Sequence, residues 1–246
     1  MSELKLAISN IAWDKADDEA VYAAMQQNGF TGLEIAPTRI FPEYPYENLT
    51  GAALFGGYLL NRWGFHVPSM QSIWYGQTGN IFDPVQAEEL LDYTAEAFQF
   101  AHTINCPSLV FGCPKNRRLP HTAAEGDAFF AKAGALASHY DVVLAIEANP
   151  PVYTNYLNNT ADAFAMVKRL QSPGLAVNLD LSTMISNGER LRDFVDDIKY
   201  VSHVHISEPG LEPIVPRQEH KELAMLLKAV GYSGDVSIEM KRTDVE

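Results

Sequence analysis

The sequence lacks several features that would define whole classes of protein. No apolar run reaches the roughly 20 residues that a membrane-spanning helix needs. The N-terminal stretch MSELKLAISN contains no basic and apolar leader. Only two cysteines, Cys106 and Cys113, are present, without the spacing of a zinc-binding pair, so we expect reduced thiols in a cytoplasmic protein. No G-x-G-x-x-G motif follows the first strand-like run, which disfavours a dinucleotide-binding fold.

Positive charge is also scarce. The chain carries 18 Lys and Arg residues against 31 Asp and Glu residues, a net charge of −13. Lys and Arg supply most of the attraction to a phosphate backbone, so this balance disfavours nucleic acid as a partner. We therefore expect a small-molecule ligand, with neither a nucleic-acid nor a membrane partner.

What the sequence does contain is a regular alternation of strand-like and helix-like segments. The expected strands span residues 4–9, 32–36, 64–69, 108–111, 142–147, 175–180, 200–206 and 235–240. The expected helices between them span residues 17–28, 48–63, 84–103, 122–139, 161–170, 189–196 and 218–230. Eight such alternations predict an α/β fold, a (β/α)8 TIM barrel that forms a single domain over residues 1–246.

The last repeat of this pattern is incomplete. Only Lys241–Glu246 follow the eighth strand, so the eighth helix is predicted to be short or absent. The outward face of that strand, formed by Val236, Ile238 and Met240, still needs a cover. A partner subunit, a helix from elsewhere in the chain or an unusual end arrangement would supply it, and of these we favour a homo-oligomer.

Four of the later strand-like runs end in a residue that binds hard metal ions. The runs are VVLAIE, LAVNLD, VSHVH and VSIE, and they end at Glu147, Asp180, His205 and Glu239. In each run the large aliphatic residues have one parity and the final residue has the other. Successive strand side chains point to opposite faces, so the four residues should meet inside the mouth of the barrel. Three carboxylates and one imidazole suit one divalent ion such as Mn, Mg, Co, Fe or Zn.

Around these four positions, the stretches IEANP, NLDLS, HVHISEP and GYSGDVSIEM resemble the xylose-isomerase-like TIM-barrel superfamily, and in particular its ketose 3-epimerase branch. The resemblance implies a divalent-metal-dependent sugar isomerase or epimerase that moves a proton next to a carbonyl through an enediolate. It implies that one ion is held by Glu147, Asp180, His205 and Glu239. It also implies that Glu147 and Glu239 are the catalytic residues that move the protons.

Two positions depart from the epimerase pattern and leave alternatives open. Thr183 stands where the epimerases usually have a histidine, and Leu211 stands where they commonly have an arginine. The same ion and glutamates would also serve a dehydratase of a keto-polyol or sugar acid, and a non-catalytic sugar-binding barrel is a further alternative. A zinc apurinic endonuclease shares this barrel, but Thr183 and the acidic charge disfavour it.

Six further residues are candidate substrate contacts from their positions, namely His66, Trp74, Lys115, Arg117, Glu34 and Arg217. Trp74 follows the third strand and would form an apolar wall for the sugar. Lys115 and Arg117 lie in the basic loop after the fourth strand and would hold a phosphate or carboxylate of the substrate. Asn149 and Ser207 would orient the metal ligands.

Overall fold

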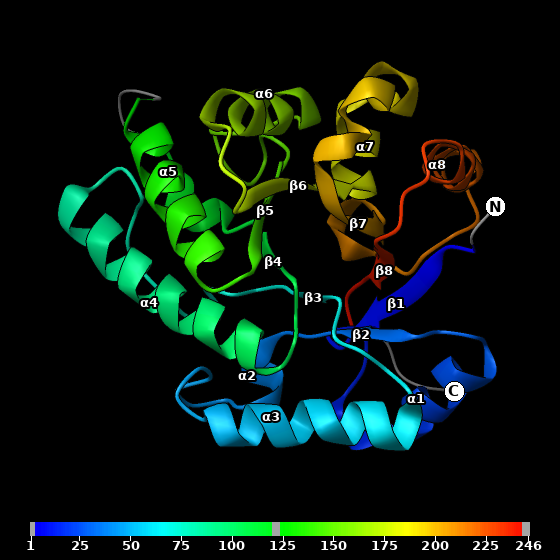
Figure 1. Ribbon diagram of the computed structural model, residues 1–246. Helices are drawn as coiled ribbons and strands as arrows, with labels where there is room; N and C mark the ends of the chain where they lie inside the picture. Colours follow the sequence, from blue (N-terminus) through cyan, green and yellow to red (C-terminus); the bar gives the residue numbers. More distant parts are fainter. Residues whose placement is uncertain (1–2, 120–123, 243–246) are drawn as a thin grey trace.

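Eight parallel strands form a nearly closed barrel in the computed structural model, which describes residues 3–119 and 124–242 (Figure 1). The strand order is β2-β1-β8-β7-β6-β5-β4-β3. Bridges from Gly32 to His66 and from Ile35 to Met70 join the two outer strands of this order. The strands are β1 (Lys5–Ser9), β2 (Gly32–Glu34), β3 (Ser69–Met70), β4 (Ser108–Phe111), β5 (Val143–Glu147), β6 (Leu175–Asp180), β7 (Val201–Ser207) and β8 (Asp235–Glu239).

Helices lie outside the strands and follow the chain around the barrel (Figure 1). They are α1 (Asp18–Gln27), α2 (Pro37–Ile40), α3 (Leu49–Tyr58), α4 (Pro84–Thr103), α5 (Ala124–His139), α6 (Thr160–Leu170), α7 (Leu181–Asn187) and α8 (Gln218–Ala229). The start of α4 shows how the sequence sets these bounds. The Asp83 carboxylate accepts hydrogen bonds from the backbone N–H groups of Val85 and Gln86, and Pro84 occupies the first helical position.

The alternation within each strand separates the core from the barrel interior. In β5, Leu144 and Ile146 are fully buried within the hydrophobic core cluster that the strands form with the surrounding helices. The opposite parity, which ends at Glu147, faces the inside of the barrel. The predicted (β/α)8 barrel is thereby confirmed.

The segment after β6 differs from the prediction of one helix over residues 189–196. The chain turns at once into α7, and a separate 3-10 helix follows at Leu191–Tyr200. The reason is that Asp180 itself caps α7, since its side chain accepts a hydrogen bond from the Thr183 N–H. An Asp expected only as a metal ligand is thus also a helix start signal.

The outer face of β8 has little cover. Within residues 3–119 and 124–242, no helix follows β8. Val236 is buried, but Ile238 and Met240 are only partly buried, and Leu6 on the adjacent strand β1 is 36% exposed. Leu6 pairs with Val236 in the sheet, so these residues form one apolar strip, which we call the β1–β8 strip.

No helix in the part of the chain that the structure describes is long and apolar enough to cross a membrane.

Candidate metal centre

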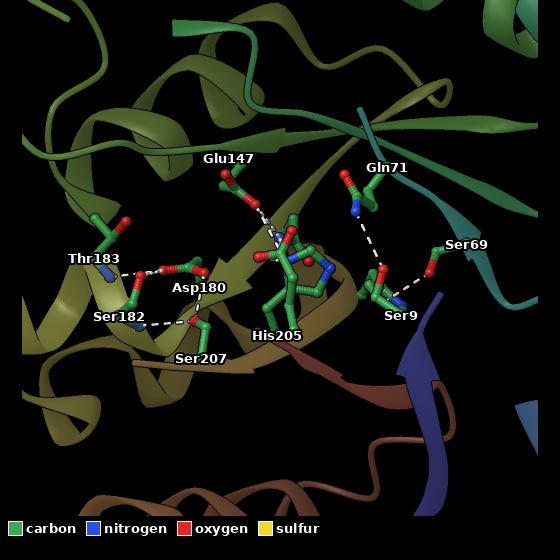
Figure 2. A network of polar contacts seen from close by, with 12 residues as sticks. Ser9, Ser69, Gln71, Glu147, Asp180, Ser182, Thr183, His205 and Ser207 are labelled. Atoms are coloured by element: carbon green, nitrogen blue, oxygen red, sulfur yellow. Dashed lines mark hydrogen bonds and ion pairs between the residues drawn. The ribbon is translucent and has the colours of Figure 1, made fainter. Parts of the chain in front are cut away.

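The four predicted ligands come together at the carboxyl ends of their strands. Ligand atoms of Glu147, Asp180 and His205 all lie within 4.8 Å of one another (Figure 2). The His205 Nδ1 atom is 3.3 Å from Glu147 Oε2 and 3.3 Å from Glu239 Oε2. Glu147, Asp180 and Glu239 border a cavity of about 250 Å³ at the mouth of the barrel, and His205 lies buried beside them. The parity argument therefore predicted the placement of these side chains correctly.

Asp180 is held by three donors from neighbouring elements. The Ser182 hydroxyl and the Thr183 N–H donate to Oδ1 at 2.7 and 2.6 Å, and the Ser207 hydroxyl donates to Oδ2 at 2.7 Å (Figure 2). Ser207 thus lies where it was expected to orient a ligand. Because both oxygens are fixed, the carboxylate cannot rotate away from the mouth.

Glu147 is held by two asparagines. The Asn149 Nδ2 atom donates to Oε1 and the Asn178 Nδ2 atom donates to Oε2, each at 2.8 Å. The Asn149 Oδ1 atom in turn accepts from the Arg117 guanidinium at 2.6 Å. Asn149 was expected in this role, whereas Asn178 was missed. The signal for Asn178 was its inward parity, two residues before Asp180 on the same strand.

His205 is supported from below by a buried carboxylate. The Glu34 Oε2 atom lies 2.8 Å from His205 Nε2 and 2.9 Å from His203 Nε2, and it accepts from the Ser69 hydroxyl at 2.5 Å. All four side chains are buried. Glu34 and the two histidines also meet the spacing of a ligand group, but each histidine is hydrogen-bonded to the same Glu34 oxygen. With the Glu34 carboxylate on Nε2, the Nδ1 atom faces Glu147 and Glu239 at the mouth and would be the ligand atom of this histidine.

Acidic side chains outnumber basic side chains at the site. Burial would raise the pKa of Glu147, but hydrogen bonds from His205 and the two asparagines outweigh it and hold that pKa below its usual value. Burial and the adjacent Glu147 raise the pKa of Asp180. Burial, aided by Glu147 and against the pull of His205, raises the pKa of Glu239 to about 7. Carboxylates that crowd one imidazole in this way fit a divalent cation.

His66 is not part of this site, and its prediction as a substrate contact is wrong. It bridges to Gly32 at the start of β2, and its Nε2 atom lies 2.9 Å from Asp235 Oδ1 at the start of β8. These are the amino ends of the strands, so His66 lies at the opposite end of the barrel. The third strand was expected at 64–69, but its pairing continues to Met70, which places His66 at its beginning.

The predictions of Glu34 and Arg117 as substrate contacts are also wrong, because both side chains are fully buried. Glu34 lies beneath His205. The Arg117 guanidinium lies behind Asn149, and burial lowers its pKa to about 10. Both residues support metal-ligand candidates instead. For Glu34 the error arose because strand parity gives the direction of a side chain but not its depth in the barrel. For Arg117 it arose because position in a loop does not say whether the side chain turns outward or inward.

The remaining three candidates have different surroundings. Arg217 forms a two-point ion pair with the buried Glu208, which occupies its guanidinium. Trp74 is almost fully buried, donates to the Thr94 hydroxyl at 2.9 Å and lines a cavity at the mouth. Lys115 is exposed and lines the same cavity. Contact with substrate remains a prediction for Trp74 and Lys115.

The family of the chain follows from comparison with known proteins. Residues 22–245 match the model of the xylose isomerase-like TIM barrel, and the chain belongs to this family. No curated protein sequence matches the chain.

Solved structures show the same fold at low sequence identity. The 3-keto-D-glucoside 4-epimerase YcjR from E. coli is 17% identical, with a TM-score of 0.77 over 99% of this chain and 94% of that one. The D-psicose 3-epimerase from Clostridium cellulolyticum H10 is 15% identical, with a TM-score of 0.78 over 99% and 86%. A family 2 AP endonuclease from Brucella melitensis is 20% identical, with a TM-score of 0.76 over 98% and 94%.

Proposed function

We propose that this protein is a divalent-metal-dependent sugar isomerase or epimerase. One observation carries the proposal. Oxygens of Glu147 and Glu239, which come from β5 and β8, each lie 3.3 Å from the same imidazole nitrogen of His205. Two carboxylates from separated strands therefore flank one point. The epimerases among the similar structures support the same reaction class.

The residues of the site would have three roles, which are metal binding, proton transfer and orientation of the ligands. Glu147, Asp180, His205 and Glu239 would hold the ion, which would supply a Lewis acid that polarises the substrate carbonyl. Glu147 and Glu239 would move the proton next to that carbonyl, one on each side of the reacting carbon. Asn149 and Asn178 keep Glu147 aimed at the mouth, and Ser207 does the same for Asp180.

A screen of ketoses, aldoses, sugar acids and sugar phosphates in D2O tests the proposal. The protein is loaded with Mn²⁺, Mg²⁺, Co²⁺, Fe²⁺ or Zn²⁺, and proton NMR follows the loss of the C–H signal next to the carbonyl. We expect exchange with at least one sugar, which requires metal and disappears in Asp180→Asn. A product that lacks one water relative to the substrate would redirect the assignment to a dehydratase. Binding of sugar without exchange or turnover, with every metal, would reject an enzyme.

A further inference from the structure

The cavity of about 250 Å³ beside Glu147, Asp180 and Glu239, which we call the metal-end cavity, is one part of a longer trough across the barrel mouth. A second cavity of about 580 Å³ shares Pro114 with it, and a third of about 780 Å³ continues from the second. The second and third cavities share the lining residues Ser72, Tyr75, Gly76 and Gln77. The walls come from loops after β1, β2, β3 and β4, so the trough lies at the same end of the barrel as the metal centre. We call the third cavity the distal trough.

The distal trough displays two aromatic side chains that the fold does not use. Tyr44 and Tyr75 line it and are 72% and 71% exposed. Among the described residues, neither hydroxyl makes a hydrogen bond to protein. Tyr44 also has a φ of 48°, in the left-handed region that costs a bulky residue energy. Because folding leaves both rings exposed, their burial does not stabilise the fold. Their position in the wall of a cavity therefore points to a ligand.

The remaining walls of the distal trough suit a hydroxylated ligand. Thr38, Ser72 and Gln77 supply neutral donors and acceptors between the aromatic rings. The two arginines in the wall are already paired, Arg39 with Asp18 and Arg242 with Asp14. Apart from these two paired arginines, the described lining consists of apolar side chains, ring faces and neutral polar groups. A sugar ring, with one apolar face and a rim of hydroxyls, matches this combination.

We infer that the distal trough binds a second sugar ring, so that the substrate is a ketose carrying a glycosyl group rather than a free monosaccharide. The inference rests on the proposed function, because the reacting ring would occupy the metal-end cavity. That cavity, at about 250 Å³, is smaller than the roughly 300–1,000 Å³ of common small-molecule sites, and the trough supplies the remaining space. The glycosyl ring would pass Lys115 and Trp74 and stack on Tyr75 and Tyr44.

Binding measurements on ketose disaccharides test this. The probes are fructose and the disaccharides turanose, maltulose, leucrose and isomaltulose, which carry a glucosyl group on different hydroxyls of fructose. Affinities for the Mn²⁺-loaded protein are measured by calorimetry. We expect at least one disaccharide to bind about tenfold more tightly than fructose, the scale of one stacked ring. Absence of any preference over fructose, whether both bind equally or none binds, would overturn the inference.

Two variants locate the contact. Tyr75→Ala and Tyr44→Ala should each remove most of the disaccharide preference and leave fructose affinity unchanged. Tyr75→Phe keeps the ring and should keep the preference. Leu54→Ala, an exposed residue on α3 outside the trough, is the control for nonspecific effects. A preference that survives both Tyr75→Ala and Tyr44→Ala would place the second ring elsewhere and overturn the inference.

The outcomes also separate this inference from the proposed function. Tyrosine-dependent disaccharide binding without C–H exchange would keep the trough and reject the chemistry. Exchange on fructose without disaccharide preference would keep the chemistry and reject the trough. Light scattering of Tyr44→Ala tests the alternative that the tyrosines bind another copy of the protein instead of a sugar. A change in oligomeric state in place of a change in sugar affinity would make these tyrosines an interface and overturn the inference.

Discussion

His205 joins the two polar layers of the barrel interior. Its Nδ1 atom faces the two glutamates at the mouth, and its Nε2 atom faces Glu34 below. Burial would lower the pKa of His205, but the surrounding carboxylates outweigh it and raise that pKa well above the usual value. A single imidazole thereby links the groups that would hold the ion to the groups that hold the ligand in place.

At the scale of single residues, the two glutamates Glu147 and Glu239 give the sharpest prediction. Glu147→Gln and Glu239→Gln keep the shape and one metal-binding oxygen but remove the base. We expect each to lower kcat by at least about a hundredfold, the usual scale for a positioned general base. Metal content should fall less than in Asp180→Ala, as elemental analysis would show. Wild-type turnover and C–H exchange in both variants would contradict the two-glutamate mechanism.

Glu34 is predicted to act on metal affinity through His205. In Glu34→Gln the amide cannot accept from both histidines and the serine as the carboxylate does, so His205 loses its fixed orientation. We expect metal affinity to fall about 10–100-fold, the range seen when a partner of a metal-bound histidine is removed. Ser69→Ala is the matched control, because it removes another contact to the same oxygen without touching His205. Equal effects of the two changes on calorimetric affinity would argue against this role.

At the scale of the elements, Asp180 both ends β6 and starts α7. Asp180→Ala removes the helix cap as well as the carboxylate, and loss of a cap costs about 0.5–2 kcal/mol. Asp180→Asn removes the charge but keeps an oxygen for the Thr183 N–H. Without added metal, we expect chemical denaturation to show Asp180→Ala less stable than Asp180→Asn by about that amount. Equal stabilities would mean that the cap contributes nothing.

The pair Glu208–Arg217 connects the end of β7 to the start of α8. Hydrogen bonds from Arg217 lower the pKa of Glu208 below its usual value. A lowered folded-state pKa stabilises the fold above the unfolded-state pKa, and this stability is lost as the pH falls through the folded value. We expect Arg217→Gln to lower the unfolding free energy at pH 7. The difference from wild type should shrink once the pH falls below the usual Glu value of about 4.3, and it should vanish only below the lowered folded-state pKa of Glu208. A difference that persists in acid would show a contribution other than charge.

At the scale of the whole molecule, the β1–β8 strip leads to a prediction about assembly. We expect light scattering to show a homo-oligomer, because Leu6, Ile238 and Met240 would otherwise remain in contact with water. Leu6→Glu should shift the protein toward the monomer. Leu54→Glu, which alters a leucine that is exposed on α3, should not. A wild-type protein that stays monomeric at high concentration would contradict the prediction.

The sequence by itself determined the barrel and the residues at its mouth. Strand parity and the spacing of strand ends are local properties, so the order of residues along the chain was enough to place Glu147, Asp180, His205 and Glu239 on one face. Asn149 and Ser207, which were expected to orient the ligands, lie within two residues of Glu147 and His205 in the sequence. The start of α4 at Asp83 and Pro84 was equally local.

Only the tertiary structure decided depth, register and pairing. His66 has the chemistry of a site residue, but the pairing of β3 with its neighbours puts it at the far end of the barrel. Glu34 points inward as expected, yet it lies beneath His205 because the barrel interior is filled in layers, and Arg117 folds in behind Asn149 instead of facing the substrate side. The trough with Tyr44 and Tyr75 joins loops that are distant in sequence. Such features depend on which segments meet, and no local pattern in the chain encodes that.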